Sequence, residues 1–106
     1  MAVIVITARV PEPAARQVAA VRRATGLGLT DIRGRLVSGS PLIERELFLN
    51  EHDEVAAEIR RLLAATAQAD IPTQIYELQP GEHIDTAPLD ICRISEQTLE
   101  GILDRY

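Results

Sequence analysis

The most constraining feature of the sequence is a double-glycine turn, Gly26-Leu27-Gly28, that separates two stretches of helical periodicity. Apolar residues recur at helical spacing over residues 14–25, and the stretch 30–37 begins with a threonine suited to cap a short second helix. Gly26 fits the left-handed position that closes a helix. Leu27 can enter a core between the two helices, and Gly28 lets the backbone start again. The turn therefore predicts a helix pair, which must pack on something else.

Three other stretches have the pattern of strands. Residues 2–10 are rich in β-branched side chains, residues 42–49 alternate, and residues 71–78 follow with Pro72 at an edge or a late start. A third helix is expected between the last two strands, with Asn50 as its N-cap. Its core stripe is Val55, Ile59, Leu62 and Leu63. The order βααβαβ predicts an α+β two-layer sandwich, in which helices cover one face of a three-stranded antiparallel sheet.

Residues 80–106 are expected to form a C-terminal extension of this domain, residues 1–79, after a break at Gln79-Pro80-Gly81. Leu89–Cys92 has the pattern of a brief strand or an extended lead-in. Ser95 can cap a short helix over 95–105. Its apolar residues fall at i, i+3, i+4 and i+7: Leu99, Ile102, Leu103 and Tyr106. We expect this helix to cover the sheet face that the first three helices leave open, in its own subunit or in a twofold partner. A tail that does not pack would be a binding peptide.

Charge is unevenly divided along the chain, whose formal net charge is −5. Residues 13–41 carry five arginines and one acid, whereas residues 42–106 carry fourteen acids and five arginines. The overall acidity argues against a nucleic-acid partner, which would need a dominant basic surface. The basic segment is either a solvated helix face or a docking site for an acidic protein.

Nothing in the sequence indicates a membrane protein or a secreted one. No apolar run approaches the ~20 residues that cross a bilayer, and the first residues read as a strand rather than a signal peptide. The single cysteine, Cys92, cannot form an internal disulfide. These features predict a cytoplasmic protein.

The segment Ala19–Leu29, with the sequence AAVRRATGLGL, resembles the C-terminal domain of the bacterial ribosomal stalk protein. The resemblance extends by pattern over residues 3–78, and the adaptor of the Clp protease is a distant relative by fold. It implies the βααβαβ fold and a protein-docking surface on the first two helices. The positions that form this docking surface in the family correspond here to Ala14, Ala15, Val18, Ala19, Arg22 and Arg33. The family's dimerisation domain and hinge have no counterpart here, and alanines replace the lysines of its first helix. We therefore expect a shared scaffold rather than a ribosomal role.

Candidate chemical groups are few. The double-glycine turn follows a helix and lacks the residues of a phosphate-binding loop. His52 and Asp53 diverge on their helix and cannot chelate one ion together, and His83 is isolated. Cys92 lies between isoleucines and is more typical of a packing residue than of a nucleophile. We expect no catalytic residue, metal or cofactor.

The sequence thus favours a non-catalytic protein-interaction module that docks an unknown protein through its first two helices. Val18 would supply the apolar contact, and Arg22, Arg23 and Arg33 would guide the charge. One alternative is an acidic immunity or inhibitor-type protein that binds a basic partner through residues 42–106. Others are a homodimer through the open sheet face or the tail, and an enzyme or ligand-binding protein with a pocket near His83 and Cys92.

Overall fold

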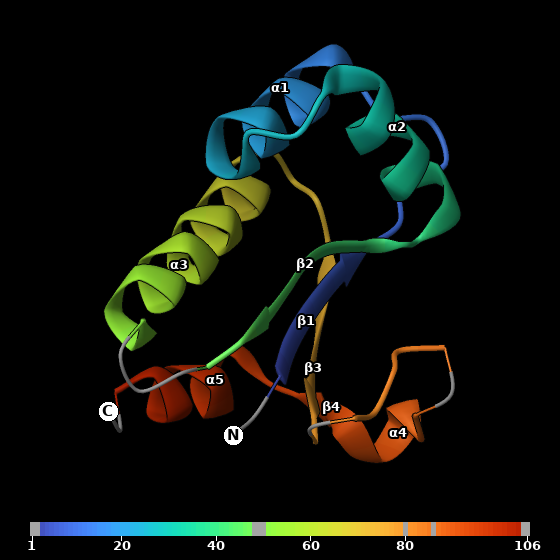
Figure 1. Cartoon of the computed structure of the whole chain (residues 1–106). Helices are drawn as coiled ribbons and strands as arrows, with labels where there is room; N and C mark the ends of the chain where they lie inside the picture. Colours follow the sequence, from blue (N-terminus) through green and yellow to red (C-terminus); the bar gives the residue numbers. More distant parts are fainter. Residues whose placement is uncertain (1–2, 48–50, 80, 86, 105–106) are drawn as a thin grey trace.

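A computed structural model describes residues 3–47, 51–79, 81–85 and 87–104. The predicted cap Asn50 and the predicted tail residue Tyr106 lie outside these residues. The first six elements follow the predicted order, and three short ones come after them (Figure 1). In chain order they are β1 (Val3–Ala8), α1 (Ala15–Thr25), α2 (Leu29–Ser38), β2 (Pro41–Glu46), α3 (His52–Gln68), β3 (Thr73–Leu78), α4 (Leu89–Cys92), β4 (Arg93–Ile94) and α5 (Glu96–Leu103).

The sheet is antiparallel and has four strands in the order β2-β1-β3-β4, so the prediction of three strands is wrong. The fourth strand consists of Arg93 and Ile94, which pair with Tyr76 and Ile75 on the outer edge of β3. Two residues are too few to produce an alternating pattern. Strand β4 forms because the edge of β3 presents N–H and C=O groups that need partners.

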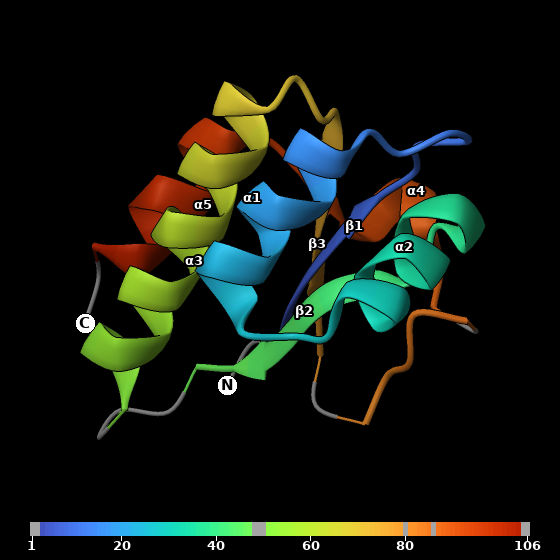
Figure 2. The ribbon, with the colours of Figure 1, turned by 90° about the horizontal axis from the view of Figure 1, so that it is seen from above.

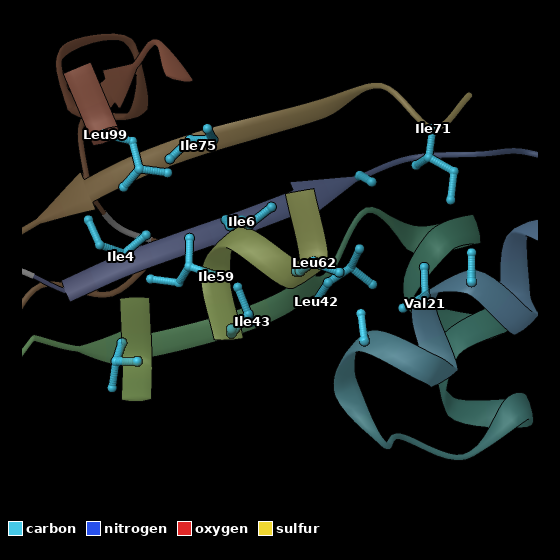
Figure 3. Close-up of a cluster of buried hydrophobic side chains, with 14 of the residues drawn as sticks. Ile4, Ile6, Val21, Leu42, Ile43, Ile59, Leu62, Ile71, Ile75 and Leu99 are labelled. Atoms are coloured by element: carbon cyan, nitrogen blue, oxygen red, sulfur yellow. The ribbon is translucent and has the colours of Figure 1, made fainter. Parts of the chain in front are cut away.

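The main core lies between one sheet face and the helices. Strand β1 alternates as predicted, and its Ile4, Ile6 and Ala8 face the helix layer, where they are buried. Figure 3 shows Ile4 and Ile6 among side chains from α1, α3, β2 and β3. The predicted stripe of α3 is also confirmed, with Val55, Ile59 and Leu62 fully buried.

Helix α5 joins this same core, so our expectation that it covers the opposite face is wrong. Its Leu99, Ile102 and Leu103 are buried in the main core, and α5 lies beside α3 (Figure 1). The predicted Ser95 cap is confirmed, because its Oγ accepts a hydrogen bond from the backbone N–H of Thr98 at 3.1 Å. Covering the same face lets α5 extend a core that α1–α3 leave unfinished at one end of the sheet.

The second sheet face is covered by the segment that precedes β4. Val5, Tyr76 and Leu78 form a separate buried cluster, against which Ile84, Ala87 and Cys92 pack. The segment that we expected to be a strand or lead-in, Leu89–Cys92, is the short helix α4, which lies on the opposite side of the sheet from α3 (Figure 1). Part of the second face is therefore covered by the chain itself.

The double-glycine turn joins α1 to α2 as predicted, but its two glycines differ. Gly26 closes α1 in the left-handed region at φ 77°, and its N–H donates to the carbonyl of Arg22 at 2.8 Å. Leu27 is half-buried against the main core. Gly28 has an ordinary φ of −69° and is itself the N-cap of α2, so Thr30 is not the cap. Only Gly26 requires a glycine for its backbone conformation.

Candidate docking site

Helices α1 and α3 lie side by side on the outside of the molecule (Figure 2). A groove runs between their side chains. The start of α1 is joined to the end of α3 by the side chain of Gln17. Its Nε2 donates to the carbonyl of Ala69 at 3.2 Å, while its Oε1 accepts the N–H of Ala14 at 2.9 Å. The register of the two helices, and with it the shape of the groove, is set at this end.

The bottom of the groove is made of alanines and its sides of long polar residues. Ala20, Ala24 and Ala69 are buried, and Ala65 is half-buried beside them. Exposed Arg16 and Arg23 line one side from α1, and exposed Arg61 and Gln68 line the other from α3. The groove has a volume of about 570 Å³. Small side chains at the bottom leave room for another chain to approach the two helix backbones.

The groove is basic although the protein is acidic. Nη2 of Arg16 lies 3.2 Å from Oδ2 of Asp70, but both side chains are exposed, so water screens this pair. Among the described residues, neither Arg23 nor Arg61 forms an ion pair. Two uncompensated guanidinium groups therefore share a shallow groove, which concentrates positive potential there.

The neighbouring Arg60 does not line the groove, because successive residues on a helix point about 100° apart. It turns toward α5, where it donates to Glu100 at 3.0 Å and to Asp104 at 2.9 Å. The hydrogen bond with Glu100, followed by the charges of both carboxylates, raises the pKa of the Arg60 guanidinium. Arg60 holds the tail, and Arg61 remains in the groove.

The four predicted partner contacts do not form one surface. Val18 is 2% exposed in the main core and cannot touch a partner, so that assignment is wrong. Arg33 reaches back to the start of α1, where its Nη1 donates to the carbonyl of Pro13 at 3.2 Å. Arg22 is exposed in the last turn of α1, at the other end of that helix. Only Arg23 lines the groove.

The sequence reasoning missed Arg16 and Arg61, although a signal was present. Arg16, Ala20 and Arg23 stand at i, i+4 and i+7, and Arg61, Ala65 and Gln68 repeat that spacing on α3. Each set forms one stripe along its helix. A matching pair of stripes does not by itself reveal that the two helices are neighbours, which only the packing decides.

His52 and Cys92, which the sequence offered as candidate chemical groups, both make packing or hydrogen-bond contacts within the fold. Nε2 of His52 is hydrogen-bonded to the carbonyl of Leu103, and His52 is buried. Cys92 is half-buried against the second cluster, and burial together with Glu82 and Glu77 raises the pKa of its thiol. Within the described ranges, no three His, Cys, Asp or Glu side chains are grouped so as to hold a metal ion.

The fold and the groove define a small α+β domain with a basic surface groove. No family model matches this chain, and we found no match to it among curated proteins or solved structures. The resemblance to the ribosomal stalk domain therefore stays a prediction. In the part of the chain that the structure describes, no helix is both long enough and apolar enough to span a bilayer.

Proposed function

We propose that this protein is a non-catalytic interaction module that binds an acidic segment of a partner protein in the α1–α3 groove. The observation that carries the proposal is the placement of Arg16, Arg23 and Arg61 around a bottom of alanines. The docking surface thus lies between the first and third helices, rather than on the first two as the sequence suggested.

The chemistry of the groove favours carboxylates. A guanidinium group offers parallel N–H donors that match a carboxylate, and such pairs are stronger than neutral hydrogen bonds. Because each arginine is exposed, one pair contributes little, and binding depends on engaging several at once. A polypeptide that carries acids along its length meets this requirement, whereas a single small anion reaches only part of the groove.

The remaining surface supports selectivity. With a net charge of −5, the protein as a whole repels acidic partners, and the arginines of the groove oppose this repulsion locally. The groove therefore orients an approaching acidic segment, and its association should weaken as salt is added.

The test is fluorescence anisotropy with a labelled glutamate-rich peptide as the probe. Arg23→Glu with Arg61→Glu should weaken binding at least about tenfold, since attraction at two points becomes repulsion. Arg22→Glu with Arg33→Glu makes the same change of charge outside the groove and should retain most of the binding.

Equal losses in the two double variants would mean that net charge, not the groove, attracts the peptide, and the proposal would fail. Thermal unfolding of both variants checks that neither has lost its fold. The same proteins should then be used to capture partners from lysate. A partner that is lost with the groove variant and kept with the outer variant would be the ligand, and its binding segment should be acidic.

A further inference from the structure

A second hollow, with a volume of about 750 Å³, lies on the sheet face opposite the helices. The apolar cluster of Val5, Tyr76 and Leu78 covers only one end of that face. Toward the other end the hollow is lined by polar residues of the sheet, together with Ile84 and Asp85 from the chain that follows β3. The hollow has the size of small-molecule sites, which are roughly 300–1,000 Å³.

The strand register places three polar side chains together in this cleft. Thr7 of β1 is paired with Gln74 of β3, and Tyr76 lies two residues further along on the same face. The Tyr76 hydroxyl donates to Oε1 of Gln74 at 2.6 Å. That bond fixes the side-chain amide, so its Nε2 donors are available on the remaining side.

The turn between α2 and β2 forms another wall of the cleft. Ser38 and Ser40 hydrogen-bond through their hydroxyls at 2.8 Å, and the N–H of Ser40 donates to Oγ of Ser38 at 3.3 Å. Gly39 between them closes α2 in the left-handed region at φ 79°. The side chain of Arg9 runs over this glycine, with its Cβ and Cδ 3.8 Å from where a Cβ of residue 39 would stand.

Two cations and one anion line the same cleft. Arg9 enters from the end of β1, and Arg93 enters from β4, where pairing with Tyr76 places it beside the ring. Asp85 is the opposing charge on the loop after β3. Among the described residues, none of these three forms an ion pair, so Asp85 neutralises neither arginine directly.

We propose that this cleft binds a small polar anion that carries carboxylate or phosphate groups. Arg9 and Arg93 would hold its charged oxygens, and the Thr7, serine and Gln74 groups would hydrogen-bond its remaining polar atoms. The two arginines enter from different strands, which suits a ligand with two separated charges better than a single small ion. This site is separate from the α1–α3 groove and does not depend on the function proposed there.

The test measures binding of inorganic phosphate and of citrate to the whole protein. Amide shifts in ¹⁵N-labelled protein are followed by NMR up to about 10 mM, a range that covers millimolar affinity. We expect saturable shifts at Thr7, Ser40, Gln74 and Arg93. Response to phosphate alone would assign a phosphorylated ligand, response to citrate alone would assign a carboxylate, and response to both would assign the shared anionic chemistry.

Arg9→Gln with Arg93→Gln should remove these shifts, raising the Kd at least about tenfold, because both charges are lost. Arg22→Gln with Arg33→Gln removes two charges outside both the cleft and the groove and should leave these shifts unchanged. The proposal is overturned if neither anion produces saturable shifts, if the shifts map to the α1–α3 groove, or if the two double variants lose them equally.

Discussion

Nε2 of His52 lies 2.5 Å from the carbonyl oxygen of Leu103, so the first residue of α3 donates a hydrogen bond to the last residue of α5. About two turns further into α3, Arg60 holds Glu100 and Asp104. The tail is therefore fastened along α3, the helix that supplies one side of the basic groove. A chain end that resembles an appendage in the sequence supports the element that carries the candidate site.

His52→Leu should lower the free energy of unfolding by about 1–3 kcal/mol, because it removes the donor to a buried carbonyl. His52→Gln should recover part of this loss, since its Nε2 can take the place of the imidazole Nε2. Urea unfolding of the three proteins measures the difference. If His52→Leu were as stable as the wild type, the contact would contribute nothing to the fold.

Leu99→Ala should cost about 2–5 kcal/mol, because Leu99 is 0% exposed and the main core would gain a cavity. Ile91→Ala removes a similar side chain from the same tail, but Ile91 is 82% exposed. It should change stability by no more than about 0.5 kcal/mol. Chemical denaturation of both variants makes the comparison. Two equally small effects would show that the tail does not belong to the core.

Gly26→Ser should destabilise the protein by about 1 kcal/mol, because a side chain is strained at φ 77°. Gly28→Ser should be neutral or stabilise by a few tenths, since residue 28 has the extended backbone of an N-cap and no atom lies within 4 Å of its Cβ position. Comparing the melting temperatures of the two variants with that of the wild type distinguishes the roles of the two glycines. Similar losses would mean that residue 28 also requires a glycine, which its backbone conformation and its surroundings do not explain.

Cys92 should react slowly with iodoacetamide at neutral pH. Burial, then Glu82 and Glu77, raise the pKa of its thiol, so the thiolate forms only above the ordinary value of about 8.5. The rate should increase as the pH passes this raised pKa, and Glu82→Gln should shift the increase toward lower pH. Urea-unfolded protein is the control and should react faster at neutral pH. Equal rates in the folded and unfolded chains would contradict the prediction.

Asp70→Asn should strengthen binding of the acidic peptide by about two- to fivefold, since it releases Arg16 from a surface pair worth at most about 1 kcal/mol. Residue 70 has a left-handed φ of 58°, which asparagine tolerates, so the turn after α3 should survive. Asp31→Asn is the matched control, because Asp31 pairs with Arg35 on α2 outside the groove. Anisotropy with the same probe measures both, and identical gains would reflect net charge alone.

Local patterns predicted the elements that bury a continuous apolar face. The alternation of Ile4 and Ile6, the spacing of Val55 and Ile59, and the cap at Ser95 each appear within a few residues of sequence. The physical requirement in each case is local as well, because backbone hydrogen bonds and one-sided burial act over one element. These features hold in the structure.

The misplaced features depend on contacts between distant segments. Strand β4 is only two residues long, Arg93 and Ile94. It forms because β3, far earlier in the chain, offers an edge at which Tyr76 pairs with Arg93. The face that α5 covers depends on the end of the main core that α1–α3 leave unfinished. Residues 93–103 carry no local pattern that indicates either this unfinished end or the free edge of β3.

The sequence by itself determined the order of the first six elements, the buried faces of β1 and of α3, and the left-handed closure at Gly26. The tertiary structure decided which helices are neighbours, and therefore that Val18 is buried while Arg23 faces Arg61 across a groove. The physical reason is that an amphipathic pattern specifies one direction for each element, toward apolar surroundings. It does not specify which element supplies those surroundings, and the groove is a property of the pair.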